Sequence, residues 1–393
     1  VELYLAGAQL GDGAAPHLKA IPTLEALDLS STGIGDWGLS QLTALPLKRL
    51  RLYPTNVSDA GLVYVGQMKG LEVLHLAGGN ISDGGIAHLT GLTKLRELHL
   101  NSNRVSDLGH TWIAKLKALR TLRLHGNVAG GWTLDRFAGL KGLRELEIWG
   151  GLHPDAADGF GKLTQLRSLA LIDTAIADKG LAEIGKLKNL ERLHITGAGN
   201  VRDFLLTRLE GLPKLKELAV TNSKLSSKGL AALGRLFGGA AASSADLKEL
   251  AGLDRIGIGG TGLTDDSLAY LKACGALKQL TVRSGKVSDA GLAHLKSMGS
   301  LETLDLRDTS VAGGGLAQLK GLGKLGWLRL PATTLTDAGL PHVAALKALH
   351  TLTLSGEGIT DKGIATLAPL KGLKRLHVTC TKLTDAGLVS YVP

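Results

Sequence analysis

The chain has 393 residues, of which 44% are hydrophobic and 20% charged, and 45 Lys and Arg against 35 Asp and Glu give a formal net charge of +10. A mean hydropathy of +0.14 indicates a dense, regular interior. Because no stretch approaches the roughly 18 uncharged apolar residues that a transmembrane helix requires, the sequence excludes a membrane-spanning helix.

A repeat of about 24 residues runs through the chain. Leucines open successive repeats from Leu24 to Leu215 and again from Leu253 to Leu373, and the gap between Leu215 and Leu253 is 38 residues. With a partial first repeat, the spacing predicts about sixteen repeats of the pattern L-x-x-L-x-L-x-x-T-x-[ILV]-[ST]-D-x-G-L-x-x-L-x-x-L-x-x. Such arrays grow in one dimension and need no larger central core.

Each repeat predicts a short strand followed by a helix. The L-x-L alternation has the period of two expected of a strand with one buried face. Leucines three residues apart, such as Leu292 and Leu295, form a helical stripe. Between these segments, Ser288 is placed to cap the helix and Asp289 to favour the positive end of its dipole. Gly291 permits close packing or a tight backbone there.

The stretch VSDAGLAHL at 287–295 also contains the residue types of a hydrolytic triad, Ser288, Asp289 and His294. A catalytic nucleophile has no reason to recur, whereas a structural device does. We therefore interpret the stretch as structural and expect His294 on the exposed convex side. Near-copies of it stand at 57–65, 81–89, 335–343 and 383–391.

On these motifs the chain resembles leucine-rich-repeat proteins over essentially its whole length. The LTDAGL segments at 335–340 and 383–388 are similar to the repeats of ribonuclease-inhibitor-like, F-box-associated and bacterial members. The resemblance implies an α/β fold, a right-handed solenoid or horseshoe with a parallel sheet on the concave face and helices on the convex face. It also implies a binding scaffold, usually for proteins. Thr replaces the Asn common in many families at Thr32, Thr55, Thr174, Thr309 and Thr381.

We predict a single leucine-rich-repeat domain over 1–393, with ten repeats in 1–236 and six in 253–393. Residues 237–252 form an Ala/Gly/Ser-rich insertion, either a solvated loop with a short helix starting near Asp246 or a functional protrusion. Because the chain begins and ends inside repeats, both ends are expected to lack caps. Cys274 and Cys380 lie more than four repeats apart, too far for a disulfide, so both are expected to be free.

GIGGTG at 257–262 satisfies the G-x-G-x-x-G pattern of dinucleotide-binding loops. It nevertheless falls in repeat register, and no acidic residue follows at the end of the next strand. We interpret it as part of a repeat and expect no cofactor.

Two clusters on the concave strand positions are the candidate partner-binding residues. Tyr, Trp and Arg are the residues most often found as interface hot spots. The first cluster is Arg51, Tyr53, His75, His99, Arg123, His125 and Trp149, and the second is Arg283, Arg307, Trp327 and Arg329.

His75 and His99 are expected at the same position on adjacent strands, where Glu97 or His125 could complete a metal site. Because Arg51 and Arg123 flank the pair, we expect no metal there. No serine or cysteine nucleophile is near, so no catalytic residue is assigned.

Opposite charges are expected to pair across strands at Asp28–Arg51, Arg123–Glu147 and Asp305–Arg329.

The concave rows carry nine positive and seven negative residues, too even a balance for a nucleic-acid partner.

The sequence therefore predicts a non-enzymatic protein-binding scaffold that uses the concave sheet surface. The alternative is a structural repeat arm of a larger assembly or cell-surface layer, contacting through the convex face or the insertion at 237–252. Trp37, Trp112 and Trp132, expected on or near the convex side, keep this alternative open. The sequence indicates neither the identity of the partner nor the compartment.

Overall fold

The computed structural model describes residues 1–393 except 79, 102–103, 127–129, 131, 175, 177, 198–202, 209–211, 237–252, 332–333, 380–381 and 391–393. The predicted insertion at 237–252, Cys380 and Thr381 lie outside the described residues. The contacts divide the chain into two compact units, Val1–Leu190 and Glu191–Pro393. The prediction of a single domain stays a prediction.

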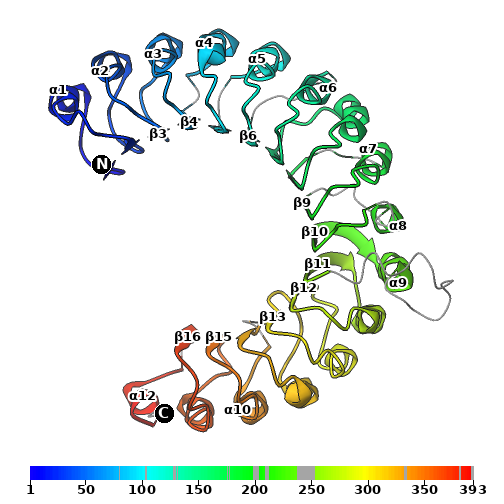
Figure 1. The fold of residues 1–393 in the computed structure, drawn as a ribbon. Helices are drawn as coiled ribbons and strands as arrows, with labels where there is room; N and C mark the ends of the chain where they lie inside the picture. Colours follow the sequence, from blue (N-terminus) through cyan, green and yellow to red (C-terminus); the bar gives the residue numbers. More distant parts are fainter. Residues whose placement is uncertain are drawn as a thin grey trace. The chain divides into compact units, whose positions relative to one another are not determined.

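The N-terminal unit, Val1–Leu190, contains eight described strands, each pairing in parallel with the next along the chain. Its strands are β1 (Glu2–Tyr4), β2 (Ala26–Asp28), β3 (Arg49–Leu52), β4 (Val73–Ala77), β5 (Glu97–Asn101), β6 (Thr121–His125), β7 (Glu145–Trp149) and β8 (Ser168–Ile172). Its helices are η1 (Asp12–Ala14), α1 (Ala15–Lys19), α2 (Asp36–Gln41), α3 (Asp59–Val65), α4 (Asp83–His88), η2 (Leu89–Gly91), α5 (Asp107–Ile113), α6 (Thr133–Phe137), η3 (Pro154–Lys162) and α7 (Asp178–Ile184), where η marks a 3-10 helix. The strands line the inner side of this unit and the helices its outer side (Figure 1).

The C-terminal unit, Glu191–Pro393, repeats this arrangement, and its described strands also pair in parallel in chain order. They are β9 (Arg192–Thr196), β10 (Glu217–Ser226), β11 (Arg255–Gly262), β12 (Gln279–Arg283), β13 (Thr303–Asp305), β14 (Trp327–Arg329), β15 (Thr351–Ser355) and β16 (Arg375–Thr379). The helices are α8 (Phe204–Thr207), α9 (Ser227–Leu236), η6 (Asp265–Ala273), η7 (Gly291–His294), η8 (Gly314–Gly321), η9 (Asp337–Gly339), α10 (Leu340–Ala344), α11 (Asp361–Ala365) and α12 (Asp385–Ser390).

The repeat pattern produces this fold because each repeat buries one strand face and one helix stripe against its neighbours. In the repeat that contains β3, every apolar pattern position is at most 3% exposed: Leu47, Leu50, Leu52, Val57, Leu62, Val65 and Met68. A lone repeat could not bury these side chains, whereas stacked repeats complete one another's core. The predicted α/β repeat fold is confirmed.

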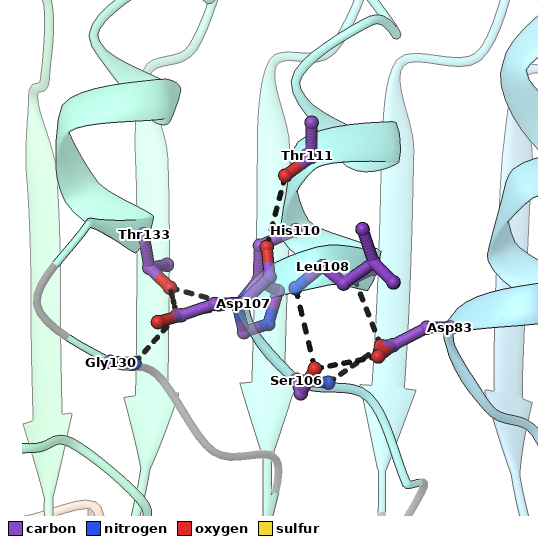
Figure 2. A network of polar contacts seen from close by, with 9 residues as sticks. Asp83, Ser106, Asp107, Leu108, His110, Thr111, Gly130 and Thr133 are labelled. Carbon is purple, nitrogen blue, oxygen red and sulfur yellow. Dashed lines mark hydrogen bonds and ion pairs between the residues drawn. The ribbon is translucent and has the colours of Figure 1, made fainter.

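Consecutive repeats are joined by a polar contact that we call the Asp–Ser clasp. The Asp83 carboxylate, at the start of α4, accepts hydrogen bonds from the backbone N and the Oγ of Ser106 in the next repeat, at 2.7 and 2.6 Å. Ser106 Oγ in turn accepts from Leu108 N at 3.3 Å and caps α5 (Figure 2). The Asp of the motif therefore links two repeats, beyond the helix-dipole role that the sequence predicts.

The same clasp recurs through both units. In VSDAGLAHL, Ser288 N and Oγ donate to Asp265 of the preceding repeat, both at 2.7 Å. Ala290 N donates to Ser288 Oγ at 3.3 Å. The predicted cap is displaced, because η7 begins at Gly291 with Ala290 as its N-cap. Asp289 accepts from the backbone N of Gly313 and Gly314 in the next repeat, both at 3.1 Å. The structural interpretation of this stretch is thus confirmed, although His294 is partly buried and not exposed as predicted.

The glycine of the motif is required by the clasp. A Cβ built on Gly291 would lie 2.6 Å from Asp265 Oδ1, and one on Gly85 would overlap the side chain and Cα of Asp59. Because real Cβ atoms do not approach other atoms this closely, the D-x-G spacing leaves room for the aspartate of the preceding repeat.

None of the described helices is long and apolar enough to cross a membrane.

Candidate functional site

The strand face is the face of the sheet opposite the helices, formed by the residues that alternate with the buried strand leucines. In the N-terminal unit, its central row follows the register Arg51, His75, His99, Arg123 and Glu147 across β3 to β7. The sequence-predicted neighbours are therefore neighbours in the structure.

Two histidines and a glutamate meet at the centre of this face. The His75 and His99 rings stack with centroids 3.8 Å apart and planes 10° apart. Glu97 Oε1 lies 2.8 Å from His75 Nε2 and 3.0 Å from His99 Nε2. The contact to His75 is a hydrogen bond, whereas His99 Nε2 makes no hydrogen bond of acceptable geometry. All three side chains are partly buried.

Burial keeps both imidazoles neutral. Desolvation lowers the pKa of His75, although the hydrogen bond and charge of Glu97 oppose this shift. Desolvation, followed by the proximity of His75 and Arg123, lowers the pKa of His99 to about 3. Near neutral pH the pair therefore presents two uncharged rings beside one carboxylate.

An aromatic group lies at the far end of the same face. The His125 ring meets Trp149 edge to face, with centroids 5.2 Å apart, and His125 Nε2 lies 2.8 Å from Glu147 Oε1. Trp149 Nε1 donates to Asp173 Oδ2 at 3.0 Å. This bond holds the Trp149 ring in an outward position, where the residue is 47% exposed.

The arginines of the face are partly neutralised by carboxylates. Arg51 Nη1 lies 3.7 Å from Asp28 Oδ2, and Arg123 Nε lies 3.3 Å from Glu147 Oε2, as predicted from the register. Tyr53, one residue beyond β3, is 48% exposed. Two exposed aromatic rings, Tyr53 and Trp149, and two half-exposed arginines, Arg51 and Arg123, thus lie on one surface.

The residues of the second predicted cluster do not line one common cavity. Arg283 lines an open cavity of about 710 Å³ together with Lys224, Lys286 and Asp308. Trp327 lines a different cavity of about 430 Å³, and the two cavities share no lining residue.

The predicted pairing of Asp305 with Arg329 is wrong, although the two residues are in register. Asp305 Oδ2 lies 2.6 Å from Arg307 Nη2, and Arg307 Nε also donates to this carboxylate at 2.9 Å. Arg307 lies two residues beyond the end of β13, and its side chain folds back onto Asp305. This leaves Arg329 outside the described ion pairs.

The repeat register, the buried leucines and the clasp all point to one family, and the family comparison agrees. A family model described as a leucine-rich-repeat region matches residues 52–311, and a second leucine-rich-repeat model matches 20–42. The chain belongs to the leucine-rich-repeat family. No curated relative matches the sequence.

Several solved structures are similar to this leucine-rich-repeat chain. An internalin from Listeria monocytogenes is 19% identical, with 92% of this chain and 88% of that chain covered and a TM-score of 0.48. A leucine-rich-repeat protein of Leptospira interrogans is 17% identical, with 97% and 96% covered and a TM-score of 0.47. The plant peptide hormone receptor RGFR1, in complex with RGF2, is 16% identical, with 97% and 78% covered and a TM-score of 0.37. Likeness at this level does not indicate what this chain binds.

Three residues near the face of the leucine-rich-repeat sheet were missed by sequence reasoning. Tyr4 is 57% exposed and pairs in register with Asp28; the Leu3-Tyr4-Leu5 alternation could have placed it. Asp173 and Asp308, which contact Trp149 and Arg283, lie beyond the strand ends at positive φ of 50° and 59°. No strand periodicity reaches these turn positions.

The glycine-rich stretch GIGGTG forms most of β11, with Gly257 opposite Thr281 and Gly259 opposite Arg283. Its assignment to the leucine-rich repeat is confirmed.

Cys274 is buried and free.

Proposed function

We propose that this leucine-rich-repeat chain is a non-enzymatic scaffold that binds a protein partner on the strand face of its N-terminal unit. The observation that carries the proposal is the exposure of Tyr53 and Trp149, at 48% and 47%, on the same surface as Arg51 and Arg123. Covering an exposed aromatic ring with a partner removes apolar surface from water, which favours binding. Tyr, Trp and Arg also contribute most of the measured binding energy in protein interfaces.

His75, His99 and His125 complete this surface as polar contacts between the two aromatic ends. The C-terminal residues Arg283, Arg307, Trp327 and Arg329 are a secondary contact region in this proposal. An even mixture of arginines and carboxylates suits a protein surface, since a polyanion would require a uniformly basic stripe.

The test is affinity capture with the intact chain, compared with an R51A/W149A double variant. Loss of hot-spot residues is expected to lower partner affinity at least about tenfold. The matched control is Trp132→Ala, because Trp132 is 72% exposed but precedes α6 on the helix side. Equal capture by the double variant and the unaltered chain would overturn the proposal.

One observation favours the second candidate, a structural arm that contacts its assembly through the helix side. Trp37, Leu108 and Trp132 are 54%, 58% and 72% exposed at the starts of α2, α5 and α6. If Trp132→Ala abolishes capture and R51A/W149A does not, this second function is supported.

A further inference from the structure

We propose that His75, Glu97 and His99 form a binding site for a divalent transition-metal ion, with Zn²⁺ as the cation that fits best. Each residue offers one ligand atom, and these atoms all lie within 4.8 Å of one another. Two imidazole nitrogens and one carboxylate oxygen are a ligand set that zinc accepts, with the fourth position open to water or another ligand. The site lies on the proposed partner-binding surface, but metal binding there does not depend on a partner.

The backbone gathers the three ligands without distortion. His75 on β4 and His99 on β5 are paired in register, so their side chains leave the sheet side by side. Glu97 precedes His99 by two residues on the same strand and therefore faces the same way. Both Nε2 atoms already converge on Glu97 Oε1, at 2.8 and 3.0 Å, so little ordering is needed to bring the ligands together.

The His99 ring nitrogen supplies a second observation. Its Nε2 is buried and lacks a hydrogen bond among the described residues, although it points toward the carboxylate. A metal ion would give this nitrogen the partner that it lacks. Because a nitrogen lone pair lies in the plane of its own ring, the two nearly parallel rings must tilt toward each other to share one ion. Binding should therefore break the ring stack.

The flanking arginines do not prevent cation binding, in contrast to the expectation from sequence. Arg51 lies beside Asp28, at 3.7 Å, and Arg123 beside Glu147, at 3.3 Å. Together with Glu97, this group of five charged side chains contains two cations and three anions, a net charge of −1. The carboxylates offset the repulsion that the arginines alone would exert on a bound ion.

The C-terminal unit provides an internal control. His194 Nε2 lies 2.8 Å from Glu217 Oε1 in the same diagonal arrangement, but Ala219 stands in register with His194 where a second histidine would be needed. Two donors hold a divalent ion far more weakly than three. The proposal therefore predicts metal binding at β4–β5 and none at β9–β10.

The experiment is calorimetric titration of the metal-free chain with Zn²⁺. We expect one ion per chain at micromolar or tighter Kd, with the affinity lowered at least about tenfold in H99Q and in E97Q. H194Q should bind as the unaltered chain does. Ring-proton NMR resonances of His75 and His99 should shift on binding. Circular dichroism checks that each variant is folded. If H99Q is unfolded, the test depends on E97Q alone, because Glu97 is the more exposed of the two residues.

A gain-of-site variant tests the same rule without altering the N-terminal unit. Ala219→His adds the missing third donor beside His194 and Glu217, so a folded A219H chain should bind a second ion. No uptake by the unaltered chain, undiminished uptake by H99Q, or no second ion in folded A219H would overturn the proposal. No partner takes part in these measurements, so their failure leaves the proposed scaffold function untouched.

Discussion

At the scale of single residues, buried polar groups are placed by the turn and clasp geometry of the repeat. Thr32 and Thr309, which replace the Asn common in many leucine-rich repeats, are 8% and 4% exposed. Each donates its hydroxyl to the carbonyl three residues earlier, at 2.6 Å. Thr55 occupies the equivalent position, yet its hydroxyl has no partner among the described residues. The Thr hydroxyl therefore closes the turn locally at Thr32 and Thr309 but not at Thr55.

His110 is the most buried histidine of the described chain, with no exposed surface. Its Nδ1 lies 2.9 Å from Thr133 Oγ1, and the Thr133 hydroxyl donates to Asp107, so Nδ1 must carry the ring proton (Figure 2). Nε2 then faces the interior without a partner. Burial lowers the pKa of His110 to about 4, although Asp107 and Asp83 oppose the shift.

This shift predicts a loss of stability in acid. The folded pKa lies below the unfolded value, so the unfolded state binds the proton first as the pH falls from about 6.5 toward 4. His110 should therefore cost about 1.5 kcal/mol of unfolding free energy between pH 6.5 and pH 5. Urea unfolding at both pH values should show a smaller loss for His110→Gln, since the other histidines are common to both chains. An equally steep loss in the variant would contradict the assignment.

At the scale of elements, the clasp joins several helix starts to the next repeat through one aspartate, one serine or threonine and one glycine. The aspartates of α3, α4 and α11 accept both the backbone N and the hydroxyl of the following N-cap. A charged acceptor with two donors contributes more than a neutral hydrogen bond does. The strands are held by their own ladder, so the clasp orders mainly the helix side of each repeat.

The clasp predicts energetic coupling between Asp59 and Gly85. Asp59→Ala should cost roughly 2–3 kcal/mol of unfolding free energy by leaving Ser82 unpaired. Gly85→Ala should cost about 1–3 kcal/mol, because its Cβ would overlap Asp59. In the double variant the overlap is largely relieved, so the cost should fall short of the sum by about 1 kcal/mol.

The measurement is a double-mutant cycle by urea unfolding. Gly13→Ala is the matched control, because a Cβ on Gly13 has no atom within 4 Å. Strict additivity for Asp59 and Gly85 would contradict the clasp as the reason for the motif glycine.

At the scale of the whole molecule, contacts run between neighbouring repeats along the chain. In each unit the strand pairing follows chain order, and successive helices pack against one another. Stability in such an array is a sum over repeats and their interfaces, so damage to one repeat should spread only to its neighbours.

A cavity in one strand tests this locality. Leu98 in β5 is fully buried, and Leu98→Ala should cost about 2–5 kcal/mol. Hydrogen exchange should rise in β4, β5 and β6 and in the helices beside them, and remain unchanged in β12 to β16. The exposed substitution Lys94→Ala should change neither region. A uniform rise across the chain would show a single cooperative unit instead.

The repeat spacing by itself determined the strands, the buried leucines and the rows of the strand face. This was possible because periods of two and three decide which side chains are buried, and a constant repeat length decides which residues stand side by side. Arg51, His75, His99 and Arg123 were accordingly placed in one row from sequence alone.

Only the tertiary structure decided which polar groups meet. Glu97 reaches two histidines, Asp173 holds Trp149, Asp305 turns to Arg307, and the motif aspartates bond the next repeat. These contacts run diagonally between strands, along one strand or between helix starts, and depend on side-chain rotamers and on how closely repeats stack. Sequence spacing specifies row and face, but not the direction in which a flexible polar side chain finds its partner.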